Sequence, residues 1–324
     1  MKKISIVTPC YNEELNIEEC WKTIREMFDT KLQGYVREHI FCDNASSDRT
    51  VEILKRIAAQ DESVKIIVNA RNFGPLRSNY NGVMAASGDA VLLCMVADLQ
   101  DPPELIPDFV KLWESGYEVV YGIRAIREEG VILRSIRRAY YRLLTGLAEL
   151  AVPPGVGDFQ LVDRRIVEAM RKIDDVHPFM RMMTFECGGK AIGVEYTWRA
   201  RKRGLSKNNF LRLFDQGING FVTFTVLPVR LVLFAGFLLA GFSVLYAFII
   251  LLIWLFSGSA AEPGIVTIIT AIFFFGGVQL LVAGLIGEYT LAIYGQVRRK
   301  PVVFESERVN FATTNPGGKA NDAQ

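Results

Sequence analysis

The sequence predicts an α/β fold built on a doubly wound, mainly parallel β-sheet. Short apolar stretches rich in β-branched residues alternate with amphipathic stretches of about ten to fifteen residues, which is the pattern of strands joined by helical crossovers. Polar turns follow three of these apolar stretches. Because right-handed crossovers bring the carboxyl ends of parallel strands to one edge of the sheet, these turns are expected to meet in one crevice.

The predicted elements follow one another in a regular order. Strands are predicted over 4–8, 39–42, 64–68, 90–96 and 118–121. Helices are predicted from after residue 14 to about 28, around 51–57, over 75–86, over 104–115 and from about 164 to 173. Between the last two helices, a turn-rich loop over 152–157 is expected to deliver residues 158–161, and the polar segment 313–324 is expected to be disordered.

The turn after the predicted strand 90–96 carries the side chains best suited to a ligand. Asp98 and Gln100 stand at the carboxyl end of that strand, and a Pro-Pro pair then blocks further pairing. Two oxygen donors at this spacing suit Mg²⁺ or Mn²⁺, which usually also takes phosphate oxygens from a substrate. The alternative is that Asp98 and Asp101 only cap the helix that follows.

The other two polar turns, at 9–13 and 43–48, offer carboxylates to a nucleotide. The chain has neither G-x-G-x-x-G after its first strand nor G-x-x-x-x-G-K-[ST], so nucleotide recognition would have to use side chains and a metal. Glu13 and Asp43 are placed to accept hydrogen bonds from a base or a ribose. The turn at 43–48 also fits an Asx turn and helix cap, in which Ser47 or Asp48 caps and Asp43 stays free for a ligand.

Two long apolar runs near the C-terminus predict a two-helix membrane hairpin. Residues 231–256 carry no charge, and as a helix they would extend about 39 Å, enough to cross a ~30 Å hydrocarbon core with tilt. Residues 264–287 form a second such run. The connector 257–263 lacks Lys and Arg whereas both flanks are basic, so both flanks and both termini are predicted on the cytoplasmic side of an inner membrane.

These patterns divide the chain into four parts: a cytoplasmic α/β domain over 1–210, an amphipathic juxtamembrane helix over 211–229, the hairpin over 230–292, and a cytoplasmic tail over 293–324. A basic amphipathic stretch that includes Arg124 and Arg127 is expected to lie on the membrane surface, or else to be the solvated face of an ordinary helix. Glycines in the second apolar run would allow close helix packing within one chain or in a homo-oligomer.

Charge and cysteine content exclude other classes. The formal net charge of +2 gives no global signal for nucleic-acid binding. The five cysteines are odd in number and form no C-x-x-C pair, and the N-terminus lacks a secretory signal. This predicts reduced thiols in a cytosolic domain.

Five motifs in order resemble those of the family 2 glycosyltransferases of GT-A fold. They are similar to P-x-Y-N-E at 9–13, D-D-G-S-x-D-x-T at 43–50, D-A-D-L-Q-D-P-P-E at 97–104, G-D-F-R-L at 157–161 and R-x-x-G-x-S-K at 201–207. Together with the two apolar runs, the match is closest to the polyisoprenyl-phosphate branch, which includes bactoprenol glucosyltransferases and dolichyl-phosphate mannose synthases. The resemblance extends from residue 4 to about residue 301.

The resemblance implies transfer of a hexose from a nucleotide-diphosphate sugar, with UDP-glucose as the leading donor, to polyprenyl (undecaprenyl) phosphate at the cytoplasmic membrane face. It implies that Asp98 and Gln100 ligate Mg²⁺ or Mn²⁺, and that the nucleotide sugar is held by Pro9, Tyr11, Glu13, Asp43 and Asp98.

The resemblance also assigns the acceptor side. Arg124, Arg127, Arg201 and Lys207 are candidates for the lipid phosphate, because a guanidinium fork matches phosphate oxygens. Asp158 is the candidate catalytic carboxylate, which would orient the acceptor or stabilise the positive anomeric centre; the alternative is that it braces its own loop. Direct displacement would invert the anomeric configuration.

The chain departs from the family pattern at three positions. Val96 replaces the first aspartate of the usual D-x-D, Asn44 replaces the second aspartate of its turn, and Gln160 stands where arginine is common. Two other functions are compatible with this domain. One is a processive polysaccharide synthase, although the Q-x-x-R-W element is missing. The other is a catalytically inactive scaffold or flippase partner that retains the fold.

Overall fold

The fold is described from a computed structural model. It covers residues 1–126, 155–173, 178–199, 264–298 and 300–311, together with scattered positions between them. The chain divides into two units. The first comprises 1–138, 150–207 and 300–324, and the second comprises 139–149 and 208–299. All five cysteines are free thiols.

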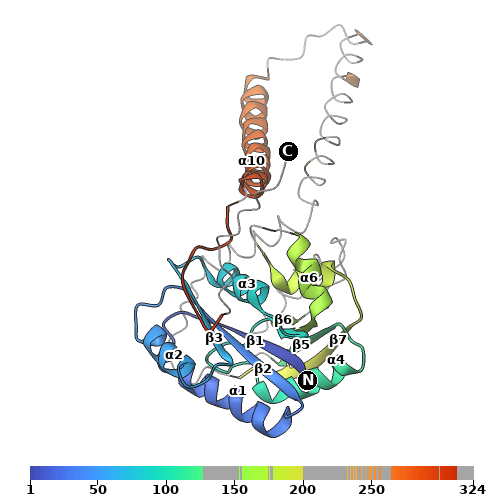
Figure 1. The fold of residues 1–324 in the computed structure, drawn as a ribbon. Coiled ribbons are helices and arrows are strands. Elements are labelled where there is room, and N and C mark those ends of the chain that lie inside the picture. The colour runs from blue at the N-terminus through green and yellow to red at the C-terminus, as the bar shows by residue number, and fades with distance from the viewer. Residues whose placement is uncertain are drawn as a thin grey trace, which may run out of the picture. The chain divides into compact units, whose positions relative to one another are not determined.

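The first unit is organised around a single mixed sheet (Figure 1). Its strands follow the spatial order β7-β5-β6-β4-β1-β2-β3-β8 in the described part of the chain. Four neighbouring pairs are parallel, namely β1–β2, β1–β4, β2–β3 and β5–β7, and three pairs that involve β6 or β8 are antiparallel. The strands span Lys2–Cys10 (β1), Tyr35–Asp43 (β2), Val64–Asn69 (β3), Ala90–Leu92 (β4), Val119–Ile126 (β5), Val156–Asp163 (β6), Ala191–Thr197 (β7) and Glu305–Val309 (β8).

Helices cover both faces of the sheet, as a doubly wound fold requires. On one face, α1 and α4 pack with the apolar residues of β1 and β4, and α1 also packs with α2. On the other face, α3, α6 and α7 form a second core with β1, β2 and β6 (Figure 1). The helices span Ile17–Lys31 (α1), Thr50–Ala58 (α2), Pro75–Ala85 (α3), Ile106–Glu114 (α4), Arg164–Ile173 (α6) and Met180–Glu186 (α7), and a 3₁₀ turn, η1, covers Pro103–Leu105.

The fourth predicted strand is shorter in the structure than the apolar run that predicted it. The regular ladder ends at Leu92, although the chain stays beside the sheet for three more residues. The amide of Leu93 donates to Gln160 O at 2.8 Å in β6, and the amide of Met95 donates to Val7 O at 2.8 Å in β1. Because the segment exchanges partners within two residues, it cannot keep the repeating pattern of one ladder.

Residues 158–161, which the sequence placed after a loop, belong to strand β6. This strand pairs antiparallel with both β4 and β5. In this register Asp158 lies beyond the last residue of β4 and between the paired positions Tyr121–Gln160 and Ile123–Val156 of the β5 ladder, so its backbone is fixed by the sheet.

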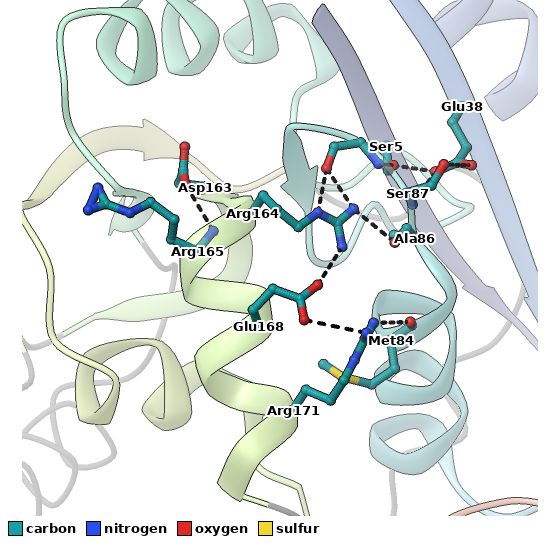
Figure 2. Close-up of polar contacts among 11 residues, drawn as sticks. Ser5, Glu38, Met84, Ala86, Ser87, Asp163, Arg164, Arg165, Glu168 and Arg171 are labelled. Carbon is teal, nitrogen blue, oxygen red and sulfur yellow. Dashed lines mark hydrogen bonds and ion pairs between the residues drawn. The ribbon is translucent and has the colours of Figure 1, made fainter.

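Arg164 joins the start of α6 to the chain after α3 (Figure 2). Its Nε and Nη2 donate to Gly88 O at 2.8 and 2.6 Å, and Nη2 also donates to Ala86 O at 2.9 Å. Two turns later Arg171 donates to Met84 O at 2.7 Å, and Glu168, which lies between the two arginines, pairs with both at 3.4 Å. Charged donors therefore satisfy the carbonyls of Met84 and Ala86 at the end of α3 and that of Gly88 in the chain that follows.

Strand β8 lies within the tail predicted over 293–324, and the sequence analysis did not anticipate it. It pairs antiparallel with β3, the neighbouring strand in the sheet. Asn310 secures its end by donating to Ala58 O and Val64 O, both at 2.9 Å. The chain therefore leaves the first unit before residue 208 and returns to it at residue 300.

The second unit contains the long helix α10, Ile265–Val297. Its segment Phe274–Val297 is the one helix among the described residues that is long and apolar enough to cross a membrane. The predicted second span, 264–287, thus falls mostly within a helix that continues ten residues further. Of the predicted first span, 231–256, only scattered positions are described, and each of these is helical. The predicted juxtamembrane helix, 211–229, lies outside the described residues.

Candidate functional site

The turns after β1 and β2 are joined by hydrogen bonds, as the expected crevice requires. The Asn12 amide donates to Ser46 Oγ at 2.9 Å, and Asn12 Oδ1 accepts from the Ser47 amide at 2.8 Å. The Glu13 amide donates to Thr50 Oγ1 at 2.9 Å. Pro9, near the end of β1, is half-buried, and the Tyr11 side chain in the turn that follows is exposed. The two turns that were predicted to bind the nucleotide sugar, after β1 and after β2, are therefore held next to each other.

The Asp43 carboxylate, which was expected to stay free for a ligand, already accepts hydrogen bonds within its own turn. Asp43 is fully buried, and its carboxylate accepts hydrogen bonds from the backbone amide of Ser46 at 2.9 Å and from the Ser46 hydroxyl. Burial raises the pKa of Asp43, and the bonds from Ser46 oppose this rise only in part. Asp43 thus closes the Asx turn itself, while Asp48 accepts from the Thr50 amide at 3.0 Å where α2 begins, as predicted for that residue.

The turn after β4 places Asp98 on the α1 side of the crevice. Asp98 is half-buried, and its Oδ1 accepts from the Gln100 amide at 3.3 Å. Ala97 packs in the same cluster as Cys10 at the end of β1. Burial raises the pKa of the Cys20 thiol in α1 to about 12, and the charges of Asp98 and Glu13 add to this rise. Asp98 therefore shares its surroundings with the first predicted donor turn.

Gln100 contacts the segment that follows β7. Its side-chain Nε2 donates to Arg199 O at 3.3 Å, and the Arg199 amide donates back to Gln100 O at 3.1 Å. Arg199 also pairs with Glu104 at 3.3 Å. The segment after β7 therefore holds the turn through both backbone and side-chain contacts.

The donor set at this turn fits a hard cation that takes most of its ligands from elsewhere. Among the residues that the structure describes, no group of three or more His, Cys, Asp and Glu side chains is arranged around a common point. Asp98 offers a carboxylate and Gln100 an amide oxygen, both half-buried. Mg²⁺ and Mn²⁺ commonly combine one or two protein oxygens with water and substrate phosphates. Asp98 and Gln100 are therefore the side chains of this turn whose oxygens could take part in holding such an ion.

Asp101 belongs to a buried charged cluster with Arg124 and Tyr196. It is 2% exposed and accepts from Arg124 Nη2 at 3.2 and 3.4 Å and from the Tyr196 hydroxyl. Arg124 Nε donates to Tyr196 Oη at 3.1 Å, and its guanidinium carbon lies 5.1 Å from the ring centroid of Trp198. Arg124 is therefore fixed in one orientation. The charges of Asp101 and Tyr196 raise its pKa, although burial acts in the opposite direction.

Asp158 lies beside this cluster and forms an ion pair that the sequence did not reveal. Arg181 Nε donates to Asp158 Oδ1 at 3.2 Å and Nη2 donates to Oδ2 at 2.7 Å. Arg181 belongs to α7, and nothing in its sequence surroundings distinguishes it from a surface arginine. The buried thiol of Cys94 is affected electrostatically by two carboxylates and two guanidinium groups, those of Asp101, Asp158, Arg124 and Arg181. These four charged side chains therefore lie in the same region, around Cys94.

The structure thus describes two sides of a candidate site, divided by the turn that carries Asp98 and Asp101. Of the predicted lipid-phosphate residues, Arg124 lies in this site. The other three, Arg127, Arg201 and Lys207, lie outside the described residues.

Comparisons with known proteins agree with this architecture. Residues 5–171 match the family model described as Glycosyl transferase family 2. An uncharacterized glycosyltransferase of Bacillus subtilis, YkcC, is 37% identical over 92% of this chain and 91% of its own length. An uncharacterized glycosyltransferase of Synechocystis, sll0501, is 33% identical over 94% of this chain and 95% of its own length. The SfII prophage-derived bactoprenol glucosyl transferase of Shigella flexneri is 33% identical over 95% of this chain and 99% of its own length.

Proposed function

This chain belongs to glycosyltransferase family 2, and we propose that it transfers glucose from UDP-glucose to polyprenyl phosphate at the cytoplasmic face of a membrane. One observation carries the proposal. The turn after β4 carries Asp98, whose charge reaches Cys20 of α1 together with that of Glu13 from the turn after β1, and Asp101, which binds Arg124. The similarity to bactoprenol glucosyl transferases over nearly their whole length supports the choice of sugar and acceptor.

The proposed donor side consists of the turns after β1 and β2. Tyr11 and Glu13 would contact the nucleoside. Asp43, which closes its Asx turn, would contribute to nucleotide binding by fixing the position of that turn and through its own carboxylate oxygens. Asp98 and Gln100 would hold Mg²⁺ or Mn²⁺ against the diphosphate. When bound, the ion would stabilise the negative charge that develops on the leaving nucleotide.

The proposed acceptor side uses fixed charges. Arg124, held by Asp101 and Tyr196, would bind the lipid phosphate without first having to order its side chain. A phosphate is already anionic, so it needs positioning more than deprotonation. Asp158 would face the anomeric carbon or orient the acceptor, and attack by a phosphate oxygen on the face opposite the leaving group would invert the anomeric configuration.

The proposed membrane topology is a two-helix hairpin over 230–292. If α10 crosses a bilayer, the rest of the second unit must cross it as well, because the residues before 208 and after 299 belong to one unit and β8 pairs with β3. Residues 231–256 are the apolar run available for that second crossing, and their described positions are helical. Basic residues on both flanks favour a cytoplasmic position for the first unit.

A lipid extraction assay tests the function. The full-length protein is incubated with labelled UDP-glucose, Mg²⁺ and undecaprenyl phosphate, and label is measured in the organic phase. The wild type is expected to transfer label, and Asp98→Ala should lose at least about 100-fold in rate while its unfolding temperature changes little. Asp108→Ala removes an exposed carboxylate from α4 as the matched control. Absence of label in the wild-type lipid phase with any UDP- or GDP-hexose would refute the proposal, and a retained anomeric configuration in the product would refute direct displacement.

A further inference from the structure

The second arginine of the charged cluster, Arg181, has no role in the function proposed so far. We propose that Arg181 is a positioning residue that holds the Asp158 carboxylate in one orientation and keeps it ionised during transfer. This inference rests on the proposed function, because it assumes that Asp158 faces the reacting centre. In this proposal Asp158 acts as a fixed negative charge during transfer and does not accept a proton.

The contact between the two side chains has the geometry of a two-point pair. Nε and Nη2 of Arg181 each donate to a different oxygen of Asp158, at 3.2 and 2.7 Å. A guanidinium fork that meets both oxygens of a carboxylate restricts rotation about the carboxylate's terminal bond, which a single contact would not. Both side chains are about a quarter exposed, at 26% and 30%, so the pair borders on the crevice and is partly shielded from solvent.

The backbones on both sides of the pair are held together by Gln160. This residue is fully buried in β6, two positions after Asp158. Its Oε1 accepts from Thr184 Oγ1 of α7 at 2.8 Å, and its Nε2 donates to Gly157 O at 2.9 Å. Thr184 is itself buried, and its Oγ1 also lies 3.2 Å from the carbonyl oxygen of Arg181. The residue that departs from the usual arginine at position 160 therefore fixes α7 against β6, and with it the distance between Asp158 and Arg181.

The charged and titratable groups facing Asp158 come from three elements. Arg181 lies on α7, Arg124 lies on β5, and the thiol of Cys94 lies just after β4. Burial raises the pKa of Asp158, but the charge and hydrogen bonds of Arg181, and then the charge of Arg124, outweigh burial and bring the pKa below its ordinary value. A carboxyl group in this setting is a poor proton acceptor at neutral pH. Without Arg181 the same burial would favour the protonated form.

The test is the dependence of the transfer rate on pH, measured on the full-length enzyme with UDP-glucose and undecaprenyl phosphate. In Arg181→Gln the acid limb of kcat/KM is expected to move to higher pH by about one unit or more, because the carboxyl group loses its main stabilising charge. Arg181→Lys keeps the charge but not the fork, so its acid limb should stay near that of the wild type while kcat falls. Arg165→Gln, on the exposed side of α6, is the matched control and should behave as the wild type.

A double-mutant comparison separates a positioning role from a direct one. If Arg181 acts through Asp158, the loss caused by Arg181→Gln should be much smaller in an Asp158→Asn background than in the wild type. An acid limb that stays in place in Arg181→Gln, together with an undiminished loss in the Asp158→Asn background, would overturn the inference and assign Arg181 an independent contact with substrate.

A second readout does not depend on catalysis. The unfolding temperature is measured between pH 7.5 and pH 2.5 for the wild type and for Arg181→Gln. Because the pKa of Asp158 is depressed in the folded protein, the pair stabilises the fold above the unfolded pKa, and this contribution is lost as the pH falls through the folded pKa. The two proteins should therefore converge toward acid pH. If the wild type transfers no glucose, the proposed function fails. If instead the difference in unfolding temperature between the wild type and Arg181→Gln does not change with pH, the ion pair does not hold Asp158 ionised, and the inference about Arg181 is overturned.

Discussion

Neutralising Asp101 is expected to destabilise the first unit although the change keeps the shape of the side chain. In Asp101→Asn the amide replaces a carboxylate that is 2% exposed and accepts from Arg124 and from Tyr196. Removing one partner of a buried ion pair costs about 3–5 kcal/mol, because the other charge stays buried without compensation. Arg124 keeps its bond to Tyr196 and its contact with Trp198, and its side chain is 17% exposed. The low end of the range, about 3 kcal/mol, is therefore expected.

The measurement is the unfolding temperature of the purified full-length protein in detergent. For a domain of about 200 residues a loss of 1 kcal/mol lowers the midpoint by about 2–4 °C, so Asp101→Asn should unfold about 6–12 °C below the wild type. Asp108→Asn is the control, because Asp108 is exposed at the start of α4 and its charge contributes less than about 1 kcal/mol. In the transfer assay Asp101→Asn should raise KM for the lipid phosphate more than KM for UDP-glucose, because Arg124 loses its fixed position.

The outcome that refutes this reasoning is an unfolding midpoint for Asp101→Asn that coincides with that of Asp108→Asn. Asp101 would then be solvated in the folded protein and Arg124 would find another partner without cost. An equal rise in both KM values would argue against the assignment of Arg124 to the acceptor side, even if the stability result agrees.

Two further predictions concern the core beneath the site. Gly82→Ala should destabilise the protein by at least about 1–3 kcal/mol, because the new Cβ would overlap the Cys42 Sγ. Gly34→Ala, whose new Cβ meets nothing within 4 Å, is the control. Denaturant unfolding that gives equal stabilities for the two variants would contradict the packing described here. Burial raises the pKa of Glu38, but hydrogen bonds led by that from Lys65 lower it to about 2, so this carboxylate stabilises the fold above pH 4.5 and the contribution is lost as the pH falls toward 2. The stability difference between wild type and Glu38→Gln should accordingly be largest at neutral pH and shrink below pH 4.5, and a difference that grows on acidification would contradict the assignment.

The parts of the fold that the sequence predicted are those with a local pattern. The helix over 164–173 was predicted at the bounds that the structure gives, and the first three strands were each found with longer ends. These elements bury one face or one stripe, so their apolar spacing is visible in the sequence itself. The convergence of three polar turns followed from the handedness of crossovers, which needs no contact information.

The parts that escaped prediction depend on distant partners. β8, Glu305–Val309, has only one apolar residue because it lies exposed at the side of β3, so it carries no hydrophobic signal. β6 is recognisable as a strand only through its pairing with β4 and β5. The pair between Asp158 and Arg181 joins residues 23 positions apart on different elements, and neither the spacing nor the residue types announce it.

The return of β8 to the sheet sets the order in which the protein can be completed during synthesis. Ser306 in β8 donates to Val68 O in β3 across 238 positions of sequence, with the second unit made in between. Ribosomes deliver the N-terminal part first, so the hydrogen-bonding groups along the outer side of β3 are without this partner until residues 305–309 emerge. An unpaired strand edge is a site for unwanted association between nascent chains. A gene shortened just after the codon for residue 300 would therefore yield a chain that keeps every side chain of the site described here and yet is prone to aggregate.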